Sequence, residues 1–246
     1  CGSAQAQRFY ISSVCGAAEI CDRTDSLVVT GGKDMVFLPS IASADPLALR
    51  EGLESLGDWP FLHIDIEDGN FVPNITFGMK AVRAICEEIQ GKEMQVHLMT
   101  KHPENYLGEL ALCGVSSVIA HVEALDYPMD FLNRCKCLGM KAGLALNMKT
   151  PVSSVDMFFG CMDELLLMTA EPDGMEQALY PAALKRAVEM AQEKGRDFKV
   201  YVDGGITEDH MAQLWKAGTD GVILGRAVFK KQNPLKFLRQ LEEIYT

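Results

Sequence analysis

From Met35 onward the sequence repeats one unit: a short apolar or β-branched run, a turn, and a stretch of helical periodicity such as TEDHMAQLWKAG. The predicted strands are 35–41, 61–66, 94–99, 116–122, 141–146, 164–169, 198–203 and 221–225. Strict alternation of this kind favours parallel strands joined by right-handed crossovers. An open doubly wound sheet usually has about five or six strands. Eight units therefore predict a closed (β/α)8 TIM barrel, an α/β fold.

Residues 1–34 stand outside this repeat. They lack a cationic start followed by a long apolar core, so they do not resemble a secretory signal peptide. We expect residues 1–34 to be an N-terminal extension, non-native or poorly ordered, and we assign it no function. We expect residues 35–246 to form a single barrel domain, with Met35 as a candidate native start.

Composition narrows the class of partner. The formal net charge is −11, which argues against a nucleic-acid groove or an anionic membrane surface as partner. No apolar run reaches the length of about 18 residues that suggests a membrane span. The eight cysteines are scattered and lack the paired spacing of a zinc ribbon. Reduced thiols in a cytoplasmic protein are the expected state.

Polar residues interrupt the predicted strands with a period of two. In the second strand the apolar residues share one face, while His63 and Asp65 share the other. The third and seventh strands place His97 and Asp203 opposite their apolar faces in the same way. If the apolar faces lie under the helices, these four side chains point into the barrel. They cluster near the carboxyl ends of the strands, where barrel enzymes have their sites.

Two imidazoles and two carboxylates at one barrel mouth are a ligand set for a divalent metal such as zinc, manganese or ferrous iron. Burial of these groups is costly, and coordination would offset that cost. Separate satisfaction of each group by local hydrogen bonds is the alternative. Four such residues on three strands favour the metal. His121 ends the fourth predicted strand, where we expect support or packing rather than metal binding.

Several stretches resemble the ribulose-phosphate 3-epimerase family. They are LPSIASADP, HIDIEDGNFVPNITFG, VHLMTKHPENYL, KAGLALNMKTP, YVDGGIT and VILGRAVF, in family order and spanning most of the chain from Met35 onward. The combination of H-x-D, H-L-M and V-D-G-G on successive barrel strands is specific. The segments IEDG, EPDG and GRAVF are closer to a poorly characterised branch of sugar-phosphate epimerases.

The resemblance implies a metal-dependent epimerase acting at carbon 3 of a ketose. The implied substrate is a pentulose 5-phosphate, such as ribulose 5-phosphate or xylulose 5-phosphate, and the implied cofactor is zinc, with Fe(II), Mn or Co as alternatives. A homo-oligomer is also implied. The family roles fall on these positions: metal ligands His63, Asp65, His97 and Asp203; an acid/base pair Asp65 and Asp203; a substrate-contacting Ser40; and Met99 and Met168 flanking the reacting carbon.

The phosphate-binding glycines of the family are only partly present. Gly204, Gly205 and Gly225 match, but Asp173, Met175 and Glu176 stand where the family typically has glycines, and Arg226 replaces a small residue. Arg226 can grip a phosphate directly. Alternatively, it pairs with Asp173 or Glu176, closes the phosphate pocket and selects an unphosphorylated or differently charged ketose. Arg226 pointing to solvent is the third reading.

A second departure is Glu67, which stands where the family usually has a methionine. It can bind an extra hydroxyl or amine of the substrate, or turn outward. A different class of function also stays open, namely a catalytically silent barrel that binds a sugar; the complete acid/base pair argues against it. A decarboxylase or aldolase would need a lysine that DIEDG does not supply.

Overall fold

The computed structural model describes residues 34–89, 91–172 and 178–246. Its eight parallel strands pair in the order β1-β8-β7-β6-β5-β4-β3-β2. The strands are β1 (Val36–Pro39), β2 (Phe61–Glu67), β3 (Glu93–Met99), β4 (Ser117–His121), β5 (Lys141–Leu146), β6 (Glu164–Met168), β7 (Lys199–Asp203) and β8 (Gly221–Leu224). A parallel bridge between Ser40 and His63 joins the two ends of the sheet into a nearly closed barrel. The predicted fold is confirmed, with strand bounds that differ by at most two residues.

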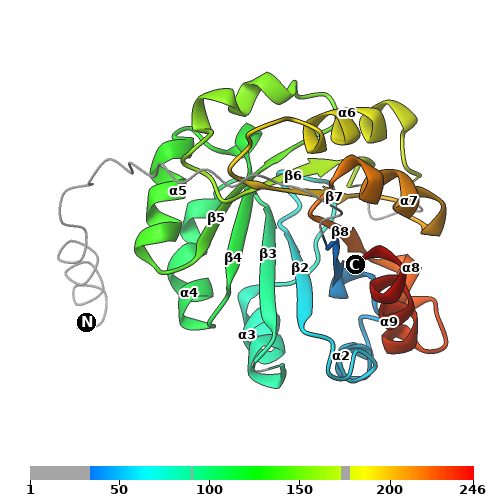
Figure 1. Cartoon of the computed structure of the whole chain (residues 1–246). Helices are drawn as coiled ribbons and strands as arrows, with labels where there is room; N and C mark the ends of the chain where they lie inside the picture. The colour runs from blue at the N-terminus through cyan, green and yellow to red at the C-terminus, as the bar shows by residue number, and fades with distance from the viewer. Residues whose placement is uncertain (1–33, 90, 173–177) are drawn as a thin grey trace, which may run out of the picture.

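Helices follow the strands and cover the outside of the barrel (Figure 1). They are α2 (Leu49–Glu54), α3 (Met79–Glu88), α4 (Leu107–Leu112), α5 (Pro128–Cys137), α6 (Pro181–Ala191), α7 (Glu208–Ala217), α8 (Arg226–Phe229) and α9 (Pro234–Tyr245). Short 3-10 helices lie at η1 (Ile41–Ser43), η2 (Pro103–Asn105), η3 (Val122–Ala124) and η4 (Val152–Phe158). Across the described ranges, no helix is long and apolar enough to cross a membrane.

The local sequence explains where α7 begins and ends. Thr207 caps the helix N-terminus, and Thr207 and His210 form a reciprocal capping box. Gly218 ends the helix at φ 80°, a left-handed conformation that glycine adopts without a steric penalty. These signals fix the helix that follows the strand carrying Asp203.

Two apolar layers confirm the assignment of strand faces. Leu62 and Ile64 belong to the large layer between the sheet and the helices. Ile119, Leu166 and Tyr201 belong to a smaller cluster inside the barrel. The interior of the barrel is therefore a packed core and not an open channel.

The expectations about residues 1–34 concern almost only residues outside the described ranges, so the N-terminal extension and the domain boundary stay predictions. Met35 itself is fixed in the barrel, because its amide donates to the carbonyl of Tyr245 in α9 at 3.2 Å.

Candidate metal centre and active site

The four predicted ligands come together at one end of the barrel. His63 and Asp65 lie on β2, His97 on β3 and Asp203 at the end of β7. One ligand atom of each residue lies within 4.8 Å of those of the other three. His63 Nε2 is 3.0 Å and His97 Nδ1 is 3.1 Å from Asp65 Oδ1, and His97 Nδ1 is 3.8 Å from Asp203 Oδ2.

These separations fit one divalent cation. Adjacent ligand atoms around a tetrahedral zinc ion, each about 2.0–2.2 Å from the metal, lie roughly 3.3 Å apart. The observed nitrogen–oxygen distances of 3.0, 3.1 and 3.8 Å bracket that value. Two nitrogen and two carboxylate donors also suit zinc and its first-row neighbours. The four residues could therefore hold a single divalent metal ion.

The electrostatics of the four side chains suit a bound cation. Burial, together with the charge of Asp65, raises the pKa of Asp203 to about 7. Burial alone would raise the pKa of Asp65 too, but His63 and His97 hold it well below its usual range. Burial lowers the pKa of His97 to about 4. The negative charge of Asp65 thus disfavours ionisation of Asp203, and a bound cation would allow both groups to ionise.

A buried polar chain orients His63 from below. Its Nδ1 lies 2.9 Å from Gln95 Oε1, and Gln95 Nε2 donates to Glu164 Oε2 at 2.9 Å. Ser117 also donates to Glu164. Because Gln95 donates its amide N–H to Glu164, its carbonyl oxygen faces His63 Nδ1, and His63 Nε2 is turned toward Asp65. Outer partners of this kind set the tautomer of a ligating histidine.

A second chain orients His97. Its Nε2 lies 2.9 Å from His121 Nε2, and the two rings stack with centroids 4.9 Å apart. His121 Nδ1 in turn lies 3.2 Å from Glu123 Oε2. This arrangement leaves His97 Nδ1 facing the two aspartates. His121 supports the cluster from outside the four-residue set, as expected from its position in the sequence.

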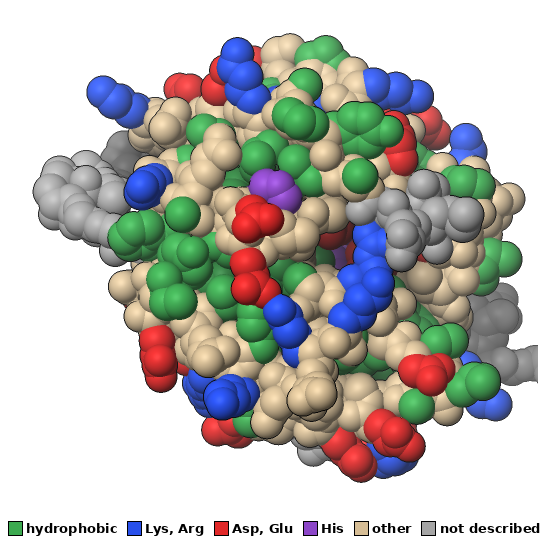
Figure 2. All heavy atoms as spheres, turned by 90° about the vertical axis from the view of Figure 1, so that its right-hand side faces the viewer, with side chains coloured by type: hydrophobic (Ala, Val, Ile, Leu, Met, Phe, Trp, Pro, Cys, Tyr) green, Lys and Arg blue, Asp and Glu red, His purple; other side chains and the backbone are tan. Residues whose placement is uncertain are grey.

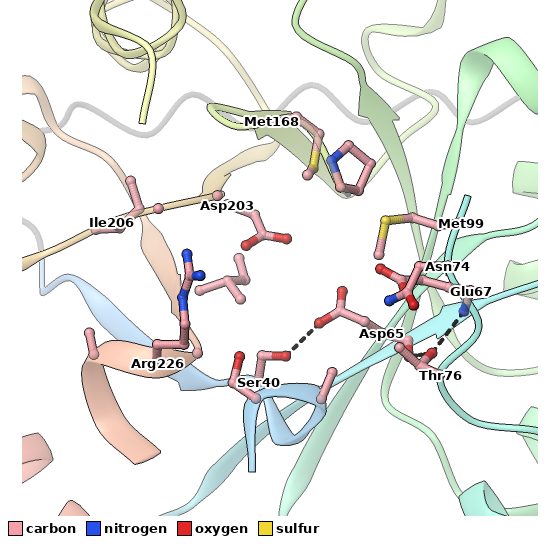
Figure 3. A pocket seen from close by; sticks show the side chains of 18 of the residues that line it. Ser40, Asp65, Glu67, Asn74, Thr76, Met99, Met168, Asp203, Ile206 and Arg226 are labelled. Atoms are coloured by element: carbon pink, nitrogen blue, oxygen red, sulfur yellow. Dashed lines mark hydrogen bonds between the residues drawn. The ribbon is translucent and has the colours of Figure 1, made fainter. Parts of the chain in front are cut away.

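A pocket of about 610 Å³ lies over the cluster, within the usual size range of small-molecule sites. All the predicted substrate residues line it: Ser40, Glu67, Met99, Met168, Gly204, Gly205, Gly225 and Arg226. Figure 3 shows Asp65 and Asp203 pointing toward one another across it, from opposite walls. Ser40 donates a hydrogen bond to Asp65 Oδ2. The sequence did not single out Asn74, Thr76 and Lys230, which also line the pocket.

One end of the pocket is lined by backbone and cations. Gly204 and Gly205 have φ values of 114° and 68°, and a Cβ on Gly204 would lie 2.5 Å from the amide nitrogen of Ala170. Only glycine fits there, and it leaves the backbone open to a ligand. Arg226 lines this end and points into the pocket. Lys and Arg side chains gather beside a hollow in Figure 2.

Asp173, Met175 and Glu176 lie outside the described residues. The alternative in which Arg226 pairs with one of these carboxylates therefore stays a prediction.

The other end of the pocket is acidic. Glu67 ends β2 with only 7% of its surface exposed, and Asn74 Nδ2 donates to its Oε2 at 2.5 Å. Burial, with a contribution from the charge of Asp65, raises the pKa of Glu67 to about 7. Thr76 Oγ1 donates to the carbonyl of Asp65 at 2.6 Å and accepts from the amide of Glu67 at 3.0 Å. Glu67 thus lines the pocket instead of turning outward.

Comparison with solved structures supports the architecture. The chain is similar to a tryptophan synthase alpha-subunit mutant from Pyrococcus furiosus, with a TM-score of 0.63 and 16% identity, over 87% of this chain and 98% of that one. At this level of identity the likeness concerns the fold alone, and it confirms the TIM barrel.

Comparison of sequences is more specific. Residues 36–229 match the ribulose-phosphate 3 epimerase family. The ribulose-phosphate 3-epimerase of a Synechocystis strain is 36% identical over 212 residues, 82% of this chain and 90% of that protein. The ribulose-phosphate 3-epimerase of Bacillus subtilis is 34% identical over 209 residues, 82% of this chain and 96% of that protein. Since the match covers nearly the whole barrel and includes all four converging side chains, the chain belongs to the ribulose-phosphate 3-epimerase family.

Proposed function

We propose that the protein is an isomerase that inverts carbon 3 of a ketose, and that its substrate is a pentulose 5-phosphate such as ribulose 5-phosphate or xylulose 5-phosphate. One observation carries the proposal: Asp65 and Asp203 face each other across a pocket that also holds the metal ligands. Binding a sugar does not require two opposed carboxylates, whereas inverting a carbon does.

The chemistry assigns a role to each carboxylate. Carbon 3 of a ketose is next to the carbonyl, so its proton can be removed if the resulting negative charge is stabilised. One aspartate accepts that proton on one face, and the other donates a proton on the opposite face. A bound divalent ion supplies Lewis-acid stabilisation of that charge. Ser40 holds Asp65 through its hydrogen bond, and Met99 and Met168 give the reacting carbon apolar surroundings.

Zinc is the ion we propose, because four ligands of mixed nitrogen and oxygen type suit it. Fe(II), Mn and Co fit the same donors and are the alternatives. The phosphate would lie at the end lined by Gly204, Gly205, Gly225 and Arg226. Backbone amides that glycines leave open, together with an arginine fork, suit an oxyanion.

Hydrogen exchange at carbon 3 tests the proposal. Metal-loaded protein is incubated in heavy water with ribulose 5-phosphate and, separately, with unphosphorylated ribulose. We expect deuterium to enter carbon 3 of the phosphorylated ketose much faster. Exchange only without the phosphate would support a closed phosphate pocket, and no exchange with any ketose would favour the silent sugar-binding barrel.

Two expectations from the sequence accompany this proposal: a homo-oligomer and a cytoplasmic location. The first rests on the family resemblance alone. Light scattering of the purified protein would give a mass above that of one chain if it is right.

A further inference from the structure

The two ends of the pocket differ in chemistry. In Figure 3, Asp65 and Asp203 lie between Arg226 on one side and Glu67 and Asn74 on the other. A bound molecule that reacts between the two aspartates therefore has one part near Arg226 and the other near Glu67. The end at Arg226 suits an anion, so the end at Glu67 must recognise something else.

Hydrogen bonds fix both the backbone and the side chain of Glu67 at the end of β2. Its backbone amide donates to Thr76 Oγ1 at 3.0 Å, and its Oε2 accepts from Asn74 Nδ2 at 2.5 Å. Asn74 is fixed in turn, because its carbonyl accepts from the amide of Gly69 at 2.9 Å. Among the described residues, Asn74 alone hydrogen-bonds the Glu67 carboxylate through its side chain. The pair is therefore preorganised before any ligand arrives.

The donors and acceptors of the pair define what it can bind. A carboxylate accepts at both oxygens, so Oε1 can accept from a group in the pocket. The Asn74 amide has two N–H donors, of which one reaches Glu67. A hydroxyl group donates one hydrogen bond and accepts another, which matches a carboxylate beside an amide. A methyl group at the same place would leave a nearly buried carboxylate without that partner.

We propose that Glu67 and Asn74 form a subsite for the terminal hydroxyl of the ketose, at the end remote from Arg226. The inference rests on the proposed function. In a ketose that reacts at carbon 3 with its anion on carbon 5, the remote end is the hydroxymethyl group at carbon 1. The subsite would select ketoses that carry a hydroxyl at carbon 1 over those that lack it.

The test compares xylulose 5-phosphate with 1-deoxyxylulose 5-phosphate, which differ in that hydroxyl alone. For each, kcat/KM of deuterium entry at carbon 3 is measured with the metal-loaded wild type, Glu67→Met and Glu67→Gln. Glu54→Met, which removes an exposed carboxylate on α2, is the matched control. We expect the wild type and the control to prefer the hydroxylated ketose by on the order of 10- to 100-fold, the range of one charge-assisted hydrogen bond.

Glu67→Met should reduce the preference for the hydroxylated ketose to about threefold or less. Glu67→Gln should give an intermediate preference, because it keeps a hydrogen-bond acceptor but loses the charge. Equal rates for the two ketoses in the wild type would overturn the subsite whatever the variants do. A wild-type preference that survives in a folded Glu67→Met would also overturn it. Absence of exchange with both ketoses in the wild type would instead reject the proposed function, and the subsite with it.

Discussion

Two regions of the pocket are built differently. We call the cluster of His63, Asp65, His97 and Asp203 the metal end, and the region lined by Gly204, Gly205, Gly225 and Arg226 the anion end. At the metal end every ligand comes from a strand, and two buried chains of side chains hold the histidines. At the anion end the lining comes from the turns after β7 and β8; of its two cations, Arg226 begins the short helix α8 and Lys230 directly follows it. Side chains on strands are fixed by the sheet, whereas loops tolerate replacement.

This difference suggests that the metal end determines the reaction, while the residues on either side of it determine which ketose is preferred. The proposed metal ligands and the proposed acid/base pair occupy the metal end, where small displacements are costly. The departures from the family pattern at Arg226 and Glu67 lie on either side of the metal cluster. The reaction class can thus stay the same while the preferred ketose changes.

The largest expected effect comes from substitutions at the metal end. Asp203→Asn and Asp65→Asn each remove one partner of the acid/base pair, and each should lower the rate of carbon 3 exchange by at least about a thousandfold. Circular dichroism should show a folded barrel in both. Asp156→Asn, at an exposed position of η4, is the control and should keep wild-type exchange. Wild-type rates in either active-site variant would remove that residue from the mechanism.

The alternation of residues in the strands was enough to predict which side chains meet at the metal end. Period two decides which side chains enter the barrel, and the barrel fold places strand ends at one mouth. His63, Asp65, His97 and Asp203 follow from these two rules, and the structure brings them together.

What the sequence did not predict depends on partners across the barrel. Glu164 lies on β6 and reaches Gln95 on β3, three strands away in the sheet. Alternation places both side chains inward, but it does not give their height or their partner. The hydrogen bond from Asn74 to Glu67 was missed for a related reason, because it depends on how the chain turns after β2.

The second expected effect concerns the anion end. Arg226→Ala should raise KM for ribulose 5-phosphate by roughly 10- to 100-fold, because it removes a charge-assisted contact to the phosphate. KM for unphosphorylated ribulose should change little. Lys80→Ala, an exposed cation on α3, serves as the control. An unchanged KM for the phosphorylated ketose would instead favour a pairing of Arg226 with the protein's own carboxylates.

The third effect tests whether the buried chain below His63 supports metal binding. Glu164→Leu leaves Gln95 without its acceptor and should weaken zinc affinity about tenfold, as losses of outer partners commonly do. Glu164→Gln keeps an acceptor and should stay within a few-fold of the wild type. Competition with a fluorescent chelator measures the affinity. Equal affinity in wild type and Glu164→Leu would show that the chain serves packing alone.

The smallest effect is on stability. Although burial would raise the pKa of Glu123, hydrogen bonds from His121 and Thr150 lower it to about 2 from its ordinary value of 4.5. A carboxylate with a lowered pKa stabilises the fold above pH 4.5, and this contribution is lost as the pH falls toward 2. Between pH 6 and pH 3, the free energy of unfolding of the wild type should therefore fall by about 1–2 kcal/mol more than that of Glu123→Gln. Urea unfolding at the two pH values measures this, with the exposed Glu54→Gln as control; matching pH profiles in wild type and Glu123→Gln would contradict it.

Anomalous scattering from a crystal of the zinc-loaded protein tests the central claim most directly. We predict one peak at the mouth of the barrel, about 2.0–2.2 Å from His63 Nε2, His97 Nδ1 and one carboxylate oxygen each of Asp65 and Asp203. A peak bound elsewhere, or no peak among these four residues, would contradict it.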